Sequence, residues 1–549
     1  LFRPRHDRDT TGPMAPPIPP PLRPSLPAVP RSARLLALWL GLGALAVVLA
    51  AMPSSLFDLD RFAAPKELAL HLTALGAVIL LGMGAERRGG LVAPELALLG
   101  FTLWSALSAL LATNHWLAAR ALAITVSGAI IFHAARRTAR QGAGGWLLAG
   151  LGGALVVAAL TGLIQAYGFD FALLAESRAP GGTLGNRNFL AHLMAIGAPL
   201  LLLLVAESGG RRAAGLWAAG AGAMLAVLVL TRSRASWLAI GASLLTMLVA
   251  WLVARYGGRE IVAPRRIRLA ALALVIGAAA ALLLPNGLDW RSDSPYRDTM
   301  RDLTNYRAGS GRGRLIQYRN SLRLMAIDPV FGTGPGNWPV KYPLVTARGD
   351  PSFAGADPMP TNPWPSSDWV AFLTERGLVA VVALLAALAA MGLSAARRLR
   401  RGDPASARRA IALLGVLTAA LIAGAFDAVL LLAPPTLVVW AAAGVLVPET
   451  GETAPWRRRL PAGIAVVALF LACLRSLGQV KSIALAGPGW PVERLIRAVR
   501  YDPGSYRLNL MIAQRTGCAT GRAYARAAAR LFPHLPAPAR RLRACGGQR

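Results

Sequence analysis

The chain contains apolar runs that recur from Leu35 almost to Leu477 and are separated by short connections rich in arginine. Each run is roughly 17 to 25 residues long, the length with which an α-helix crosses the hydrocarbon core of a bilayer. Lipid offers no water to an unpaired backbone, whereas a helix satisfies its own backbone groups. The runs therefore predict an all-α polytopic membrane bundle of about 12–13 transmembrane helices. The spans are expected to begin near Leu35, Leu68, Leu91, Leu117, Trp146, Asn188, Ala213, Ala235, Leu269, Trp369, Ala410, Pro435 and Leu460.

Composition and charge agree with this class. Apolar residues make up 55% of the chain, charged residues 15%, and the mean hydropathy is +0.48. The net charge of +33 does not indicate a nucleic-acid partner, because the arginines lie between apolar runs rather than on one soluble face. Such connections are typical of the cytoplasmic side of a bacterial inner membrane. We therefore expect a multi-pass inner-membrane protein whose N-terminus is cytoplasmic.

The arginine-rich connections alternate with connections that hold few basic residues, and the former are assigned to the cytoplasm. This assignment divides the chain into regions. Residues 1–33 are Pro-rich and are expected to form a disordered cytoplasmic tail. Residues 34–284 are expected to hold an N-terminal bundle of about nine helices, and 369–477 the remaining transmembrane helices. The large loop 285–368 and the helices of 478–549 then face the periplasm. Pro434 and Pro435 leave a re-entrant break as an alternative to the span near Pro435.

The hairpin "TRSRASW" places Arg232 and Arg234 at the outer end of two spans, where the positive-inside rule disfavours basic residues. One interpretation is that both side chains extend to lipid headgroups. The other is an anion site at the outer membrane face, which we favour because ionisable groups at helix ends in a bundle often mark substrate paths.

The loop 285–368 is longer than a connection needs, and loops of this size are usually functional. Within it, residues 314–327 have apolar positions at helical spacing and predict an amphipathic helix along the membrane surface. Those positions are Leu315, Tyr318, Leu322 and Met325. The helix is followed by "GTGPGNW", in which Gly332, Gly334 and Gly336 indicate a tight turn. This turn is not a dinucleotide loop, because no strand precedes it.

Four motifs occur in order around this loop: "GGTLGNRNFLAHLMAIGAPLLLLL", "TRSRASWLAIGASLL", "RLIQYRNSLRLMAIDPVFGTGPGNW" and "WVAFLTERGLVAVVALL". Together they resemble the O-antigen ligase and polymerase superfamily over about Phe57 to Pro448. The resemblance implies a GT-C-like, metal-independent glycosyltransferase of lipopolysaccharide or polysaccharide biosynthesis that needs no cofactor. Its donor would be a glycan on undecaprenyl diphosphate, and its acceptor a hydroxyl on a lipid or on another glycan.

The resemblance also implies roles for the arginines. Arg232, Arg234 and Arg314 fall on basic positions thought to hold the diphosphate, and we include Arg319 of the same loop. Arginine suits this role because its charge is fixed and its fork matches phosphate oxygens. The six His residues are scattered and form no pattern of metal ligands.

The stretch "NPWPSSDWVAFLTERG" departs from the family pattern. Ligases usually have a His nine residues before the Glu that corresponds to Glu375, and this chain has Ser366 there. A carboxylate can accept the proton of an acceptor hydroxyl. Asp368, Ser366 and Arg314 are therefore the catalytic candidates, with Asp368 as the base.

A structural interpretation of this stretch stays open. Trp364 and Trp369 can form a sugar-facing rim, or they can anchor the chain at the membrane interface. Ser367 or Asp368 can serve as the N-cap of the following helix. Asn186 and Asn188 likewise lie at the entrance to a span, where we expect capping together with contact to lipid phosphates. His192, one turn further, is expected to be a buried hydrogen-bonding residue.

The region after Leu477 contains short Ala/Leu/Arg helices broken at "YDPGS" and "LFPHLP", which resembles a tetratricopeptide pair. Such a pair can pack on the membrane domain or bind a protein partner. Cys518 and Cys545 would both be periplasmic, where they can form a disulfide.

Two other function classes stay open. A transporter of lipid-linked glycans would show inverted repeats and charged residues near the middle of the membrane, and we detect neither beyond Asp427. A noncatalytic assembly factor for surface polysaccharides would keep the fold and use the C-terminal helices to bind a protein.

Overall fold

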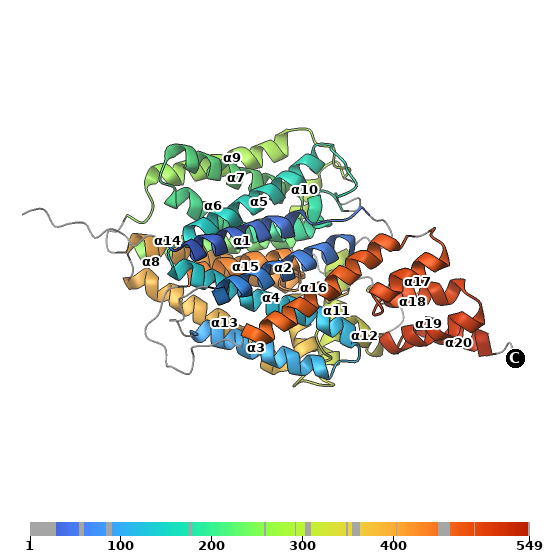
Figure 1. Cartoon of the computed structure of the whole chain (residues 1–549). Coiled ribbons are helices and arrows are strands. Elements are labelled where there is room, and N and C mark those ends of the chain that lie inside the picture. Colours follow the sequence, from blue (N-terminus) through green and yellow to red (C-terminus); the bar gives the residue numbers. More distant parts are fainter. Residues whose placement is uncertain are drawn as a thin grey trace, which may run out of the picture.

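The computed structural model of the chain describes residues 29–53, 60–83, 91–174, 178–256, 260–290, 292–301, 309–346, 350–353, 363–401, 403–447, 462–487 and 489–546. Within these ranges the protein is helical and contains no β-strand. Figure 1 shows a bundle of long helices with the C-terminal helices gathered at one end. The predicted all-α polytopic fold is confirmed. Most of the predicted tail 1–33 lies outside the described residues.

Twelve helices of the described chain are long and apolar enough to cross a membrane. They are α1 (Arg31–Leu49), α2 (Asp60–Met83), α3 (Ala93–Leu110), α4 (His115–Arg140), α5 (Gly144–Ala166), α6 (Arg187–Glu207), α7 (Arg211–Leu230), α8 (Arg234–Arg255), α9 (Pro264–Leu283), α13 (Asp368–Arg401), α14 (Pro404–Phe426) and α16 (Ala462–Leu485). The most apolar window of α6 is 83% buried and that of α9 only 17%. α6 is therefore a central helix, and α9 lies at the periphery.

The helices pack in pairs that are often distant in sequence, including α1 with α5, α7 with α9, α8 with α14 and α2 with α16. Small residues permit the closest approach. A Cβ added to Gly277 of α9 would lie 2.1 Å from the carbonyl oxygen of Gly222 in α7. Close backbone contact at small residues is typical of membrane bundles, where lipid provides little hydrophobic drive between helices.

The segment near Pro435 differs from the prediction of a span. It forms α15 (Ala433–Leu446), a helix of 14 residues, all of them buried. Such a helix rises only about 21 Å, less than the ~30 Å of a hydrocarbon core. Irregular backbone over 427–432 leads into it. The span expected near Pro435 is therefore a core helix packed on α4, and protein rather than lipid encloses the irregular backbone.

The large loop between α9 and α13 contains several short elements. They are α10 (Pro295–Arg301), α11 (Gly309–Met325), α12 (Trp338–Lys341) and the 3-10 turn η3 (Tyr342–Leu344). We call the end of the bundle that carries this loop and the C-terminal helices the loop side (Figure 1). A second 3-10 turn, η1 (Gly182–Leu184), precedes α6.

The helix predicted in the large loop is present as α11, but the side that it buries is mostly polar, with Leu324 as a buried apolar residue. Asn320 and Ser321 are buried, whereas Leu315 and Leu322 are 50% and 46% exposed. Ser321 Oγ accepts a hydrogen bond of 2.9 Å from Trp338 Nε1. The polar face is buried because the loop's own polar groups are there to pair with it, which helical periodicity alone does not reveal.

The turn 332–338 packs against a break in α13. Gly377 has φ 74° and ψ 178° inside this helix, a region of dihedral space that is almost exclusive to glycine. The carbonyls of Thr374 and Glu375 accept backbone hydrogen bonds from Thr333 and Gly334 at 2.9 and 2.8 Å. The loop thus replaces the helical bonds that the break removes. The predicted tight turn is present, and Gly332, Gly334 and Gly336 all have positive φ angles.

Four helices follow the last span: α17 (Val492–Tyr501), α18 (Tyr506–Arg515), α19 (Cys518–Leu531) and α20 (Pro536–Gly546). The boundaries between α17 and α18 and between α19 and α20 fall at the two predicted breaks, and a third boundary separates α18 from α19. Tyr506 and Phe532 pack on Val340 of the large loop, and Asn114 Nδ2 donates to the carbonyl oxygen of Leu531 at 3.2 Å. These helices are therefore docked on the membrane bundle; their tetratricopeptide character stays a prediction.

Cys518 and Cys545 form a disulfide that joins α19 to the end of α20. The cysteines are 27 positions apart, and a closed loop of that size restricts the unfolded chain by about 3.5 kcal/mol. We expect the Cys518→Ser variant to lose roughly that stability in α19 and α20, seen as faster amide hydrogen exchange there. Cys473→Ser, which removes a buried free thiol, is the control. Equal exchange in wild type and Cys518→Ser would contradict the prediction.

Candidate functional site

An open cavity of about 870 Å³ lies at the loop side, where the ends of α5, α6, α7 and α8 meet the start of the large loop. We call it the arginine pocket. Two carboxylates line it, Asp170 and Asp289, together with Trp290. It is also lined by four arginines, which are Arg178, Arg187, Arg232 and Arg234. Arginines outnumber carboxylates two to one in the lining, so the pocket favours an anionic ligand.

Arg232 is held in place by the large loop. Its backbone has φ 54°, unusual for a residue with a side chain. Its Nε donates to Thr299 Oγ1 at 2.9 Å, and its guanidinium lies 4.7 Å from the centre of the Trp290 ring. Burial lowers the pKa of the Arg232 guanidinium from its usual value, and Asp298 opposes this shift. Since arginine stays protonated throughout the physiological range, the charge persists.

The connection between α5 and α6 brings the other two arginines to the pocket. Gln165 Oε1 accepts backbone hydrogen bonds from Gly181 and Gly182 at 2.9 and 2.8 Å. The backbone N–H of Arg187 donates to the carbonyl oxygen of Arg178 at 3.1 Å. These bonds hold the connection against the end of α5, and the guanidinium of Arg187 lies 5.1 Å from the Trp290 ring centre.

Four guanidinium groups around one cavity provide many N–H donors in fixed forks, the geometry that matches phosphate oxygens. Such preorganised charge stabilises negative charge that develops in a transition state, because it needs no reorganisation at the moment of reaction. The pocket therefore suits a phosphate or diphosphate whose negative charge rises during reaction.

Ser366, which stands where ligases of the family usually have a His, lies against α11. Ser366 Oγ donates to Gln317 Oε1 at 3.0 Å. Tyr318 Oη donates to the carbonyl oxygens of Ser366 at 2.5 Å and of Ala425 at 3.0 Å. Arg314 lies one turn before Gln317 on the same helix. α11 therefore holds the Ser366 stretch between itself and the end of α14.

Asp368 is fully buried at the start of α13. Its Oδ1 accepts from the backbone N–H of Val429 at 2.9 Å and its Oδ2 from that of Leu430 at 2.8 Å. Ser367 Oγ accepts from the N–H of Val370 at 3.4 Å, as an N-cap does. Asp368 thus anchors the irregular segment before α15 in this structure, and its role as a general base stays a prediction.

The Asp368→Asn variant separates these two roles. An amide has one acceptor oxygen where the carboxylate has two, so one buried backbone N–H loses its partner, at a cost of about 1–3 kcal/mol. We expect a lower unfolding midpoint in detergent and, if Asp368 is the base, a loss of turnover that exceeds the loss of folded protein. Turnover that falls only in proportion to the folded fraction would leave Asp368 with its structural role alone.

The structure brings together some of the predicted site residues and separates others. Arg232 and Arg234 share the arginine pocket, while Arg314 and Arg319 lie on α11, outside its lining. Sequence reasoning missed Arg178 and Arg187. The available signal was their position on either side of "APGGTLGN", a glycine-rich connection at the same end of the bundle as the hairpin.

The predicted entrance residues have structural contacts. Asn186 caps α6, accepting from the N–H of Asn188 at 2.9 Å, as expected. The ring of Trp364 lies 6.3 Å from that of Phe189 on α6, and Trp369 Nε1 donates to the carbonyl oxygen of Leu421 at 3.1 Å. Contact with lipid phosphates or sugar stays a prediction for all four candidates.

His192 corrects one expectation. It is buried as predicted, but neither ring nitrogen has a hydrogen-bond partner within the described part of the chain. It lies within electrostatic range of Asp427 and Arg314.

These features define a polytopic helical membrane protein with an arginine-lined pocket beside a large loop. Residues 219–385 match the family model Wzy_C, described as O-Antigen ligase. The match confirms the resemblance over these residues, which form an O-antigen ligase family domain. That domain runs from α7 through the large loop into α13 and contains Arg232, Arg234, Arg314 and Ser366. No curated protein matches the chain.

Proposed function

We propose that this protein is an inner-membrane glycosyltransferase that transfers a glycan from polyprenyl diphosphate to an acceptor hydroxyl. The observation that carries the proposal is the arginine pocket, whose residues Arg232 and Arg234 and whose loop residues lie within the match to an O-antigen ligase family. The family supports glycan ligase- or polymerase-like activity in general, and the pocket's charge supports a diphosphate donor. The loop side would face the periplasm, as the distribution of arginines predicts.

In the proposed reaction the acceptor oxygen forms a bond to the anomeric carbon of the donor glycan. The bond between that carbon and the diphosphate oxygen breaks, and its electron pair leaves with polyprenyl diphosphate. Arg232, Arg234 and their neighbours in the pocket stabilise the added charge on the leaving group. The hydroxyl proton passes to a general base, for which Asp368 is the candidate.

Arg314 and Ser366 extend the proposed site toward the acceptor. Both lie in the matched domain, on the two segments that Tyr318 and Gln317 hold together. We propose that Arg314 contributes charge beside the reacting groups and that Arg319, exposed on α11, meets the donor at the mouth of the site. Trp364 and Trp369 would border the path of sugar or lipid.

A second candidate is a noncatalytic assembly factor. It is favoured by the absence of any His from residues 285–368 and by the bonding of both Asp368 oxygens to backbone. In this case the fold would still bind lipid-linked glycans but would not transfer them.

Reconstitution distinguishes the two candidates. Purified protein in liposomes would receive the lipid-linked glycan extracted from a strain that lacks the gene, together with that strain's acceptor glycolipids. Growth of the acceptor on a gel, with release of polyprenyl diphosphate, supports the transferase. Binding of the donor without release, paired with surface polysaccharide that disappears on gene deletion, supports the assembly factor.

A further inference from the structure

A second cavity lies at the loop side, apart from the arginine pocket. It has a volume of about 210 Å³ and is enclosed by α2, α4, α13, α16 and the turn between α17 and α18. We call it the tail cavity, because residues of the C-terminal helices form one wall. Ligand pockets usually measure ~300–1,000 Å³, so the tail cavity has room for one end of a larger molecule.

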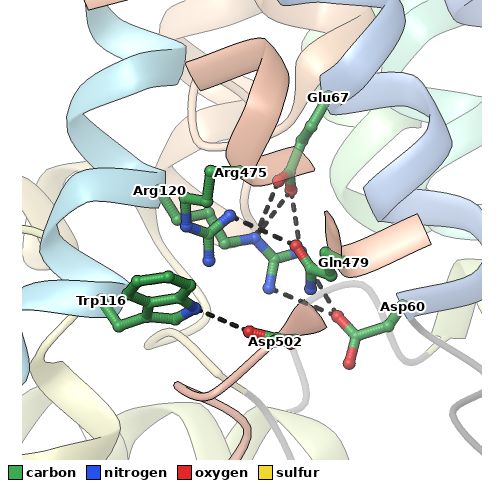
Figure 2. A network of polar contacts seen from close by, with 7 residues as sticks. All are labelled: Asp60, Glu67, Trp116, Arg120, Arg475, Gln479 and Asp502. Carbon is green, nitrogen blue, oxygen red and sulfur yellow. Dashed lines mark hydrogen bonds and ion pairs between the residues drawn. The ribbon is translucent and has the colours of Figure 1, made fainter. Parts of the chain in front are cut away.

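A polar network ties the C-terminal helices to the bundle at this cavity (Figure 2). Arg120 of α4 bonds to Glu67 of α2 at 2.8 Å and to Asp60 at 3.3 Å. Trp116 Nε1 donates to Asp502 Oδ1 at 2.6 Å, next to the turn after α17. Figure 2 shows these side chains converging from separate elements, with Arg475 of α16 beside them. Hydrogen bonds and ion pairs within the protein therefore hold the wall of the cavity together.

Arg376 is the residue in this wall that favours an anionic ligand. It lines the cavity and is only 2% exposed. Its Nε and Nη1 have no hydrogen-bond partner among the described residues, and neither does Nε of Arg475 in the same wall. Its guanidinium instead lies 4.7 Å from the centre of the Phe372 ring. A buried charge with incomplete hydrogen bonds is costly. Glu375 compensates part of this charge, and an anionic group in the cavity would add to that compensation at the guanidinium.

The lining also contains four carboxylates, Asp60, Glu67, Glu375 and Asp502; of these, Asp60 and Glu67 are paired with Arg120, and Asp502 accepts from Trp116. The remaining groups suit a sugar. Aromatic faces come from Trp116, Trp364, Tyr506 and Phe532, and short polar groups from Gln479, Ser482 and Ser505. Aromatic faces stack on the apolar face of a sugar ring, while polar groups pair with its hydroxyls. Trp364 lies between the tail cavity, which it lines, and the proposed catalytic stretch, because it is two positions from Ser366. Its ring packs near Phe189 of α6.

We propose that the tail cavity binds the acceptor: a saccharide whose phosphate or carboxylate pairs with Arg376 and whose ring lies between Trp116 and Trp364. This inference rests on the proposed transferase function and assigns its acceptor side. The C-terminal helices are then part of the substrate site, where they close the cavity over the acceptor, rather than a separate module for a protein partner.

Photo-crosslinking in native membranes tests the proposal. p-Benzoylphenylalanine replaces Arg507, which is exposed and lines the cavity, or Arg500, which is exposed on α17 outside the lining. We expect a glycan-positive adduct at position 507 and none at 500, with at least a tenfold loss of the adduct in Arg376→Gln. An adduct of equal yield at both positions, or one that contains phospholipid alone, overturns the proposal.

A kinetic measurement covers the case in which Arg376→Gln fails to fold. Arg507→Glu changes an exposed side chain at the cavity and should raise the KM for the acceptor tenfold or more at unchanged kcat, whereas Arg500→Glu should change neither. Unchanged KM in Arg507→Glu counts against the acceptor site while transfer itself stands. A glycan adduct at position 507, together with no release of polyprenyl diphosphate by the wild-type protein, refutes the transferase and leaves the binding site in place.

Discussion

Replacement of Arg234 by alanine is expected to lower glycan transfer by about 100-fold or more, because removal of one preorganised donor to a developing anion commonly costs 10²–10³ in rate. Arg234 begins α8 and lines the arginine pocket with three other arginines. The loss should appear in kcat more than in donor KM, since negative charge on the leaving group grows in the transition state. Turnover of a lipid-linked donor in liposomes measures both constants.

Arg297→Ala is the matched control. Arg297 is exposed on α10 near the same pocket but does not line it, so the variant changes net charge equally. We expect turnover within a factor of about two of wild type, because exposed surface changes contribute little. If both variants lose activity alike, the general charge of the loop side, rather than the arginine pocket, supports transfer.

Gly377→Ala is expected to destabilise the protein by about 3 kcal/mol or more, because its backbone conformation is almost exclusive to glycine. An added Cβ would also lie 2.0 Å from the carbonyl oxygen of Val330. The turn 332–338 would have to move away from α13, and with it the hydrogen bond from Trp338 N–H to Glu375 Oε1. The expected result is a lower unfolding midpoint in detergent and little folded protein in the membrane.

The same helix provides the control for this prediction. A Cβ added to Gly392 of α13 meets no atom within 4 Å, so Gly392→Ala should be neutral or slightly stabilising through its better helix propensity. Fluorescence size-exclusion chromatography and thermal unfolding compare the two variants. Equal stability of Gly377→Ala and Gly392→Ala would show that α13 does not require its break.

Much of the bundle was predictable because lipid exposure follows from local composition. Hydropathy alone located α1 to α9, α13, α14 and α16. It failed at α15, because an apolar run bounded by prolines looks the same whether lipid or protein surrounds it. The packing of α15 on α4 shows that this helix of 14 residues lies inside the protein and does not have to cross the bilayer.

The candidate site was predictable in part. Arg232 and Arg234 were predicted as site residues because the positive-inside rule disfavours arginines at that end of a span. Arg178 and Arg187 lie at the same end but were not predicted as site residues, because their connection also reads as a helix cap. Gln165 of α5 holds that connection by two hydrogen bonds, and both arginines line the same cavity as the hairpin arginines.

The sequence by itself determined the membrane class, the positions of most spans, the breaks between the C-terminal helices and the arginine pair of the hairpin. Each of these depends on neighbouring residues, through hydropathy, helix-breaking prolines and glycines, or charge. The tertiary structure decided which arginines share a pocket, which face α11 buries and where α13 breaks. These depend on contacts such as that between Ser108 and the carbonyl of Glu375, 267 positions apart. No local pattern encodes the partner in such a contact.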